Sequence, residues 1–590
     1  MNIKTLNFIL AAVIFLTLSI LLPNHTQPWL SFYQESGIFA CLICCSFALL
    51  SEKRYTTFKL SSGAIGLLAL VLIPIGQYFF GLIDFESSFL SVLFVAGFSF
   101  AIALGFQVSS IPALKVALCQ SLAVVLLLLA VISVWIALRQ WLMLPGSYLV
   151  VEMRPGARAF ANFGQPNHLA TFLCMALAGL IYIVEQKLLG RLSATFLALL
   201  ILFGVALTQS RTPWLGFFCG LIWWVWQYRK GVVSLSPYIM TLWLAVFALM
   251  VILLPSINEL LSLEGASVGE RFEKAERLTI WTQLLLAIKA GNFWGYGWGQ
   301  VAAAQLQVAL DYPIGMRIDN SHNILLDLLI WNGPFLGSII ILVALLWLLR
   351  LAMRAKTVES SFALLFSGFI LVHGMVEYPL EYAYFLIPLG LMLGIAEADA
   401  FAGTPVNGRV VKLLLGGAGL LGVIMLSCVW IEYRKIEAGF QQMRFDRANI
   451  GRPKPWPEES SIILLTQLDA RLRAAYIDIT GLISDEDMNQ LCHVAHHTPY
   501  PLELYRCGLA KGFRGDTQGA ARELLIIESL HRQRSFMWAY TELQKEAKKT
   551  PALLNVLAEI NQIRPTIKLQ YQPASKWSDV LDGGGDLWGE

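Results

Sequence analysis

Long apolar stretches limit most strongly what this chain can fold into. Thirteen of them follow one another through the first 431 residues, with polar residues between them. An apolar helix of about 17–25 residues spans a hydrocarbon core of about 30 Å. The sequence therefore predicts an all-α polytopic membrane protein with about thirteen transmembrane helices. We expect these helices near residues 6–22, 37–50, 61–80, 88–107, 113–138, 167–184, 192–208, 212–227, 234–254, 322–349, 360–375, 382–396 and 411–431.

The composition points the same way. Of the 590 residues, 57% are hydrophobic and 14% are charged, whereas a soluble domain has about 45–50% apolar and about 25% charged residues. This excludes a soluble enzyme, a disordered scaffold and a disulfide-stapled secreted domain. The formal net charge of +3 gives no basis for binding nucleic acid.

Lysine and arginine gather in alternate loops. The short loops after the even-numbered spans carry them, whereas the loops after spans one, three and eleven carry none. Positively charged loops stay on the cytoplasmic side of a membrane. We therefore expect the N-terminus to be inside, and the segments after spans five, seven and nine, with everything after Tyr433, to be outside.

The tail, residues 434–590, differs from the membrane part, residues 1–433. It has an ordinary charge content and apolar residues at helical spacing, which predicts a helical soluble domain. A helix-turn-helix expected over 501–531 is similar to a single TPR unit.

Two of the nine cysteines lie in this tail, at Cys492 and Cys507. In an oxidising compartment such a pair can form a disulfide. The neighbouring histidines His493, His496 and His497 do not supply the four defined ligands of a structural zinc site. We therefore predict no metal and no cofactor.

Arg211 opens the eighth span, in the sequence Gln-Ser-Arg-Thr-Pro-Trp. An ionisable residue at a membrane boundary is a candidate functional group, although a lone arginine there can also simply extend its side chain to the interface. The short hairpin before it fixes Arg211 at the outer surface, which favours a role in function.

The outer loop of about residues 255–321 is the longest break in the membrane part. It carries Arg271, Lys274 and Arg277 at helical spacing, followed by Trp281 and by glycines interleaved with aromatic residues that include Trp298. Such glycines let a backbone approach a ligand while flat side chains pack on a sugar or an isoprenoid. We expect these five residues to bind a lipid diphosphate or a glycan, with a plain solvated helix face as the alternative for Arg271 and Lys274.

His322 stands where this loop enters the next apolar helix, in Asp-Asn-Ser-His-Asn. The dipole at a helix N-terminus disfavours the imidazolium form, so a neutral imidazole there can accept a proton. The alternative is a helix cap formed by Asn320 or Ser321, with His322 as a bystander.

Two further groups of polar residues lie at the outer side. Gln165, Asn167 and His168 enter the sixth span together, and at that depth they need hydrogen-bond partners, either structural ones or a polar substrate. Glu377 flanks the outer end of span eleven, where it could orient an arginine or the acceptor, or form a plain ion pair.

Outward-facing arginines beside a membrane suit a diphosphate. A guanidinium binds phosphate oxygens bidentately and keeps its proton. A glycosyl diphosphate lipid has a good leaving group whose developing charge an arginine stabilises. What remains is activation of an acceptor hydroxyl, which one histidine can supply.

Four patterns follow one another over about 130 residues. They are Ser210-Arg211-Thr212, Arg277 to Trp281, the glycines Gly295, Gly297 and Gly299, and His322-Asn323 with Gly333-Pro334 and Gly337 downstream. In this order they resemble the bacterial O-antigen ligase and O-oligosaccharyltransferase superfamily. The segment 163–170, Phe-Gly-Gln-Pro-Asn-His-Leu-Ala, and the helical tail resemble the protein-glycosylating PglL-type branch.

The resemblance covers most of the chain from about residue 150 onward. It implies a multi-pass protein of the bacterial inner membrane whose active site faces the periplasm. It also implies transfer of a preassembled glycan en bloc from undecaprenyl diphosphate to Ser or Thr of periplasmic proteins such as pilin, without a metal. Arg211 and Arg277 would hold the diphosphate and His322 would activate the acceptor hydroxyl. Gln165, Asn167, His168, Asn323 and Glu377 are candidates for positioning the acceptor or substrate.

Two other functions stay open. An O-antigen ligase would use the same chemistry with lipid A-core as acceptor, and the glycan polymerases are a further related class. A lipid-linked glycan transporter would fit the spans and the basic sites without any chemistry, and would not need His322.

Overall fold

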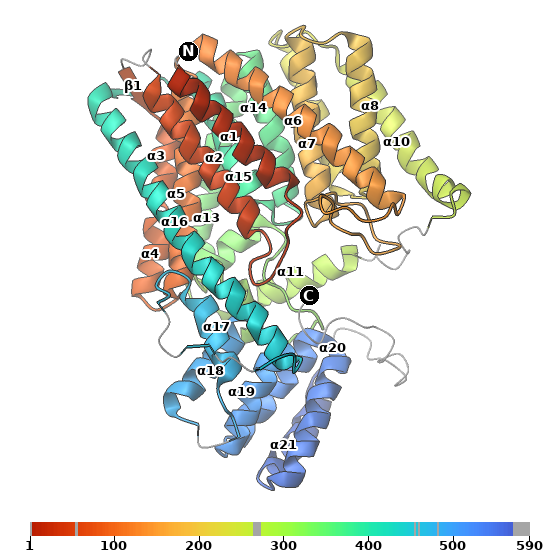
Figure 1. The fold of residues 1–590 in the computed structure, drawn as a ribbon, viewed down its shortest axis with the longest axis vertical. Coiled ribbons are helices and arrows are strands. Elements are labelled where there is room, and N and C mark those ends of the chain that lie inside the picture. Colours follow the sequence, from red (N-terminus) through yellow and green to blue (C-terminus); the bar gives the residue numbers. More distant parts are fainter. Residues whose placement is uncertain are drawn as a thin grey trace.

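The computed structural model describes residues 3–52, 57–263, 273–452, 456–457, 461–480 and 483–569. Figure 1 shows a large helical bundle above a group of shorter helices, drawn in blue, that the tail forms. The helices of the bundle are α1 (Ile3–Leu21), α2 (Phe32–Ser51), α3 (Ser62–Ala69), α4 (Leu72–Phe79), α5 (Phe85–Val108), α6 (Pro112–Trp141), α7 (Pro166–Glu185), α8 (Arg191–Leu207), α9 (Thr212–Arg229), α10 (Pro237–Leu260), α13 (Ile324–Arg354), α14 (Val358–Gly374), α15 (Ala383–Ala400) and α16 (Gly408–Arg447). The outer loop holds α11 (Glu273–Ala290) and α12 (Val301–Gln307), and the tail holds α17 (Thr466–Tyr476), α18 (Asp485–His497), α19 (Pro501–Phe513), α20 (Thr517–Lys549) and α21 (Leu553–Ile563).

Ten helices within the described residues are long and apolar enough to cross a membrane. This confirms a multi-pass membrane protein. The other three expected spans are also helices, α8, α9 and α14. Of these, α8 and α14 are only 17 residues long, and α9 is rich in tryptophan and less apolar. The count of thirteen therefore stays a prediction.

The second span is longer than the apolar pattern indicates. It was expected to begin at residue 37, but α2 begins at Phe32. The polar residues of its first turn find partners: Ser31 Oγ donates to Glu35 Oε1 at 2.7 Å, and Gln34 Nε2 donates to the carbonyl of Asn24 at 2.7 Å. These hydrogen bonds support the helix beyond its apolar part.

The tenth span is broken in a way that the sequence analysis did not predict. Within α13, Gly333 has φ +74° and ψ 165°, so the helix ends there and restarts at Pro334. A Cβ at Gly333 would lie 1.9 Å from the carbonyl oxygen of Phe293, so only glycine fits against the outer loop. The first segment, Ile324 to Asn332, is thereby held against that loop, directly after His322.

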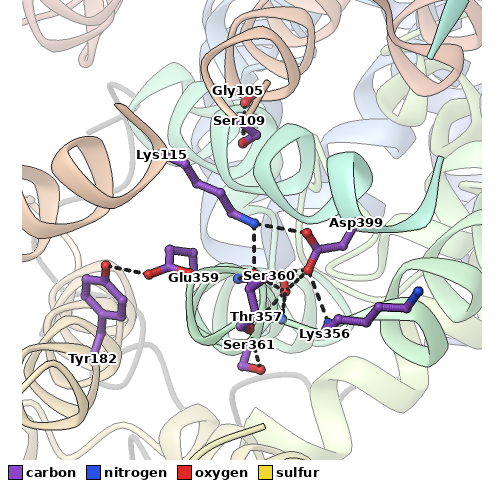
Figure 2. A network of polar contacts seen from close by, with 10 residues as sticks. All are labelled: Gly105, Ser109, Lys115, Tyr182, Lys356, Thr357, Glu359, Ser360, Ser361 and Asp399. Atoms are coloured by element: carbon purple, nitrogen blue, oxygen red, sulfur yellow. Dashed lines mark hydrogen bonds and ion pairs between the residues drawn. The ribbon is translucent and has the colours of Figure 1, made fainter. Parts of the chain in front are cut away.

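Loops predicted to be cytoplasmic meet at one face of the bundle. The segment after α2 and the segment after α15 pair as a short antiparallel sheet, β1 (Thr57–Leu60) with β2 (Thr404–Asn407), in the register Thr57 opposite Asn407. This sheet is an addition to the all-α expectation. In Figure 2, Lys115 near the start of α6 donates to Asp399 at 3.0 Å and to Thr357 at 2.8 Å. The ends of α6, α14 and α15 are thus tied together on the side where Figure 1 places the N-terminus.

The tail packs against the outer loop at the opposite end of the molecule (Figure 1). The amide of Gly315 donates to the carbonyl of Ser529 at 2.8 Å, and Arg532 Nε donates to the carbonyl of Gly315 at 3.1 Å. The predicted helix-turn-helix is present as α19 and α20, with the turn at Gly515 (φ +84°) and Asp516 as the N-cap. Its likeness to a TPR unit stays a prediction. So does the domain boundary at residue 433, which falls within the continuous helix α16.

Candidate active site

Side chains from three other segments of the chain meet at the carboxylate of Glu377. Glu377 lies in the turn after α14, and its side chain is only 5% exposed. Its Oε2 accepts a hydrogen bond from His322 Nδ1 at 2.7 Å. Its Oε1 accepts one from Asn167 Nδ2 at 3.1 Å, and it also binds the guanidinium of Arg277. Three of the residues predicted for the site thus contact a fourth.

Glu377 is a charged centre of this cluster. Burial alone would raise its pKa, but the hydrogen bond and electrostatic interaction with His322, together with the charge of Arg277, outweigh burial and hold the pKa below its ordinary value. The carboxylate is therefore ionised at neutral pH and can only accept hydrogen bonds. The proton between the two groups lies on Nδ1 of His322, so Nε2 is the ring nitrogen that can take up a proton.

His322 is held in a strained conformation. Its φ is +57°, in the left-handed region that a residue with a Cβ rarely adopts. The surroundings fix it there: Trp281 Nε1 donates to the carbonyl of Ser321 at 2.9 Å, and the ring of Tyr378 meets the imidazole edge to face with centroids 5.0 Å apart. Strain of this kind gathers at functional sites. The imidazole is 27% exposed, so a substrate can reach it.

The cap of α13 differs from the two candidates considered from the sequence. Neither Asn320 nor Ser321 is the N-cap residue. Asn323 takes this position, because its Oδ1 accepts from the amides of Leu325 and Leu326 at 3.0 and 3.1 Å. Its Nδ2 donates to the carbonyl of Met375 at 3.0 Å, which ties α13 to the Glu377 turn. These contacts give Asn323 a structural reason to be present, and its expected role in positioning substrate stays a prediction.

Arg211 begins α9 beside the cluster. The preceding residue, Ser210, donates from Oγ to Asn167 Oδ1 at 2.6 Å, and Asn167 in turn bonds Glu377. The exposed side chain of Arg211 therefore starts one residue from this network. Sequence reasoning named Ser210 only as part of the pattern Ser210-Arg211-Thr212 and gave it no role, and it did not name Tyr378, whose only signal was its position next to Glu377.

A second layer of polar residues lies on and around α7. This helix is buried along nearly its whole length. His168 Nδ1 bonds the hydroxyl of Tyr384 at 2.8 Å, and Gln165 is the residue directly before α7. His168 is thus held inside the bundle, whereas the expected role of Gln165 in positioning substrate stays a prediction.

The remaining predicted residues are spread more widely. The amide of Trp298 donates to Gln77 at 2.8 Å, and its ring lies 5.2 Å from that of Trp331, inside the core of the outer loop. Lys274 is part of α11, and Arg271 lies outside the described residues. Cys492 and Cys507 form a disulfide with Cα atoms 5.0 Å apart, which joins α18 to α19.

Comparisons with known proteins cover all of these segments. The model of the protein glycosylation ligase family matches residues 159–183, and the O-antigen ligase model matches residues 196–342. The model described as virulence factor membrane-bound polymerase, C-terminal, matches residues 361–545. A general O-oligosaccharyltransferase of Acinetobacter baylyi is 30% identical over 539 residues, 89% of this chain and 92% of that protein. The chain belongs to the PglL-type protein O-oligosaccharyltransferases.

A second relative of this oligosaccharyltransferase is a ComP-specific O-oligosaccharyltransferase of Acinetobacter baylyi. It is 27% identical over 437 residues, 72% of this chain and 76% of the relative. No solved structure matches the chain. The matched regions include the clustered residues: Asn167 lies in the protein glycosylation ligase match, whereas Arg277 and His322 lie in the O-antigen ligase match. This oligosaccharyltransferase is therefore an enzyme that transfers glycosyl groups.

Proposed function

We propose that this enzyme transfers a preassembled oligosaccharide en bloc from undecaprenyl diphosphate to Ser or Thr of periplasmic proteins such as pilin. The observation that carries the proposal is the contact of one buried carboxylate, Glu377, with both His322 and Arg277. It brings a base for an acceptor hydroxyl and a cation for a diphosphate to the same place.

Arg277 and Arg211 hold the diphosphate in this scheme. A guanidinium has five N–H donors in a planar fork, so Arg277 can bind Glu377 and phosphate oxygens together. Arg211, exposed at the start of α9, directly follows Ser210, which bonds Asn167. Their charges stabilise the diphosphate as it leaves.

His322 activates the acceptor. Its Nε2 takes the proton of the Ser or Thr hydroxyl while the hydroxyl oxygen attacks the anomeric carbon. The bond from that carbon to the diphosphate oxygen breaks, and the electron pair leaves with the lipid diphosphate. Glu377 stabilises the imidazolium through Nδ1, as the carboxylate does in hydrolytic triads. No step needs a metal, and an in-line displacement inverts the anomeric centre.

The location follows from the loop charges. Every segment that meets at Glu377 comes from a loop predicted to be outside, whereas the segments joined at Lys115 and Asp399 come from loops rich in lysine and arginine. We therefore place the site at the periplasmic face of the bacterial inner membrane, where acceptor proteins and the soluble tail meet it.

The test uses a bacterial strain that makes pilin and a lipid-linked glycan but lacks its own protein O-oligosaccharyltransferase. Expression of the chain should raise the intact mass of pilin by one glycan and leave the lipopolysaccharide pattern unchanged. Glycan attached to lipid A-core with unmodified pilin would identify an O-antigen ligase instead. If neither acceptor gains a glycan, the proposed transfer is wrong and a transporter becomes the better explanation.

A further inference from the structure

A cavity of about 260 Å³ lies where the tail meets the membrane bundle. Asp84 and Phe85, at the start of α5, form one wall. The other walls come from α17, which carries Gln467 and Arg471, and from α18, which carries His493 and His497. Sites for drug-sized ligands have volumes of roughly 300–1,000 Å³. The cavity therefore suits a single side chain or one sugar unit.

Asp84, the carboxylate of this cavity, already has partners within the chain. Asp84 accepts from Gln467 Nε2 at 2.7 Å and pairs with His493 Nε2 at 3.4 Å. The bond from His493, helped by the bond from Gln467, outweighs burial and lowers the pKa of Asp84 to about 2. Asp84 is thus ionised and already contacts two side chains of the tail, so it does not call for a cationic ligand.

Arg471 is the cation that distinguishes the cavity. Its guanidinium lies 5.4 Å from the ring centroid of Phe440 and 5.8 Å from that of Tyr500. In the part of the chain that the structure describes, no carboxylate forms an ion pair with it. A guanidinium packed over aromatic rings keeps its charge and its fork of donors. Such a group matches a carboxylate that comes from outside the chain.

The cavity is connected to the active site through the end of the outer loop. Tyr500, which Arg471 contacts, also packs against Arg317, whose guanidinium lies 4.1 Å from the centroid of the Tyr500 ring. Arg317 in turn bonds Asp319. Asp319 is three residues before His322, and its charge also acts on His497 in the cavity wall. The end of the outer loop therefore joins residues that contact the cavity wall to the segment that carries His322.

We propose that this cavity binds an acidic side chain of the acceptor protein, and that Arg471 thereby sets which Ser or Thr reaches His322. The inference rests on the proposed function. A protein acceptor arrives from the soluble side, where α17 and α18 of the tail form most of the cavity, whereas the lipid-linked donor arrives from the membrane.

The experiment uses the full chain in the same strain, with a periplasmic carrier protein that displays short acceptor peptides. Each peptide has one Ser and a single Glu at a different nearby position, and each has a matched peptide with Gln in place of Glu. The readout is the glycosylated fraction by intact mass. The variants are Arg471→Gln and Arg471→Lys. Arg473→Gln is the matched control, because Arg473 lies on the same helix but pairs with Asp469.

The wild type should favour Glu over Gln at one spacing by roughly tenfold or more, as expected for a charge-assisted hydrogen bond. Arg471→Gln should bring this ratio close to one, Arg471→Lys should keep part of it, and Arg473→Gln should keep all of it. Thermal melting of each variant shows whether a lost preference for Glu comes from a lost fold. The Glu-to-Gln ratio itself does not depend on the amount of folded enzyme.

An unchanged ratio in Arg471→Gln would overturn the inference, and so would a wild type without preference at any spacing. A change in which glycan is transferred, with the preference for Glu intact, would assign the cavity to the donor and overturn it as well. In all three cases peptides are still glycosylated, so the proposed function stands. If the wild type modifies no peptide and no pilin, both proposals fail together.

Discussion

Oε2 of Glu377 and Nδ1 of His322 lie 2.7 Å apart, although the two residues are 55 positions apart in the chain. The contact joins the turn after α14 to the strained residue before α13. It orients the imidazole and fixes which of its nitrogens carries the proton. Glu377 is therefore a positioning residue for the base that we propose.

Replacing Glu377 by Gln should slow glycan transfer by roughly 10²–10⁴-fold, the range that general acid–base catalysis contributes. The amide keeps the size of the side chain but removes the charge that stabilises the imidazolium. The initial rate of pilin glycosylation, measured with purified full-length enzyme, gives the result. Glu437→Gln is the control, because Glu437 also binds an arginine, Arg434, but on α16. Equal losses in both variants would contradict the role of Glu377.

The same carboxylate makes a pH-dependent contribution to stability. Its pKa in the folded chain lies below the ordinary value of about 4.3. A lowered pKa means that the stabilisation is fully present above about pH 4.3 and is lost as the pH falls through the lower value of the folded state. The difference in melting temperature between wild type and Glu377→Gln should be constant from neutral pH to about pH 4.3 and should shrink below it. A difference that disappears already near neutral pH would contradict this assignment.

Gly333→Ala should disturb both fold and activity. The new Cβ would meet the carbonyl oxygen of Phe293 at 1.9 Å, in a conformation that only glycine adopts readily. Strain of this kind costs about 1–3 kcal/mol, and its relief would move the helix segment that follows His322. Thermal melting and the transfer rate should both fall. Gly368→Ala in α14, where a Cβ meets open space, should leave both nearly unchanged.

Breaking the polar network of Figure 2 should destabilise the protein, although this network lies far from the active site. Lys115 and Asp399 are both largely buried, with side chains 8% and 12% exposed. Removing one partner leaves an uncompensated charge, which costs about 3–5 kcal/mol. Lys115→Met and Asp399→Asn should each lower the melting temperature clearly. The double variant should lower the melting temperature by less than the sum of the two single decreases. Additive decreases would show that the pair does not act as a unit.

Several features of the fold could be predicted from the sequence because they depend on local patterns. Apolar length placed the helices, and loop charges grouped the segments that the structure brings together at each end of the bundle. The break at Gly333 was missed, although Gly followed by Pro inside an apolar run is a known signal for it. The pairing of β1 with β2 was missed because each segment has only four residues and β2 contains a proline, which weakens a strand pattern.

The candidate site was predicted as a set of residue types, not as an arrangement. Arg277, His322 and Asn167 each stood out as polar groups beside apolar helices. That all three contact Glu377 depends on how α7, α11, α13 and α14 pack, which a single sequence does not reveal. The sequence left the role of Glu377 open between orienting an arginine or the acceptor and forming a plain ion pair. The structure shows that it contacts an arginine and the histidine together.

The central claim is that His322 is the base of a glycan transfer to protein. The most direct test compares wild type and His322→Ala as purified full-length enzymes, with lipid-linked oligosaccharide as donor and pilin as acceptor. The account predicts a loss of roughly 10²–10⁴-fold in the rate of pilin glycosylation, with binding of the donor largely retained. Transfer at an unchanged rate in His322→Ala would contradict it.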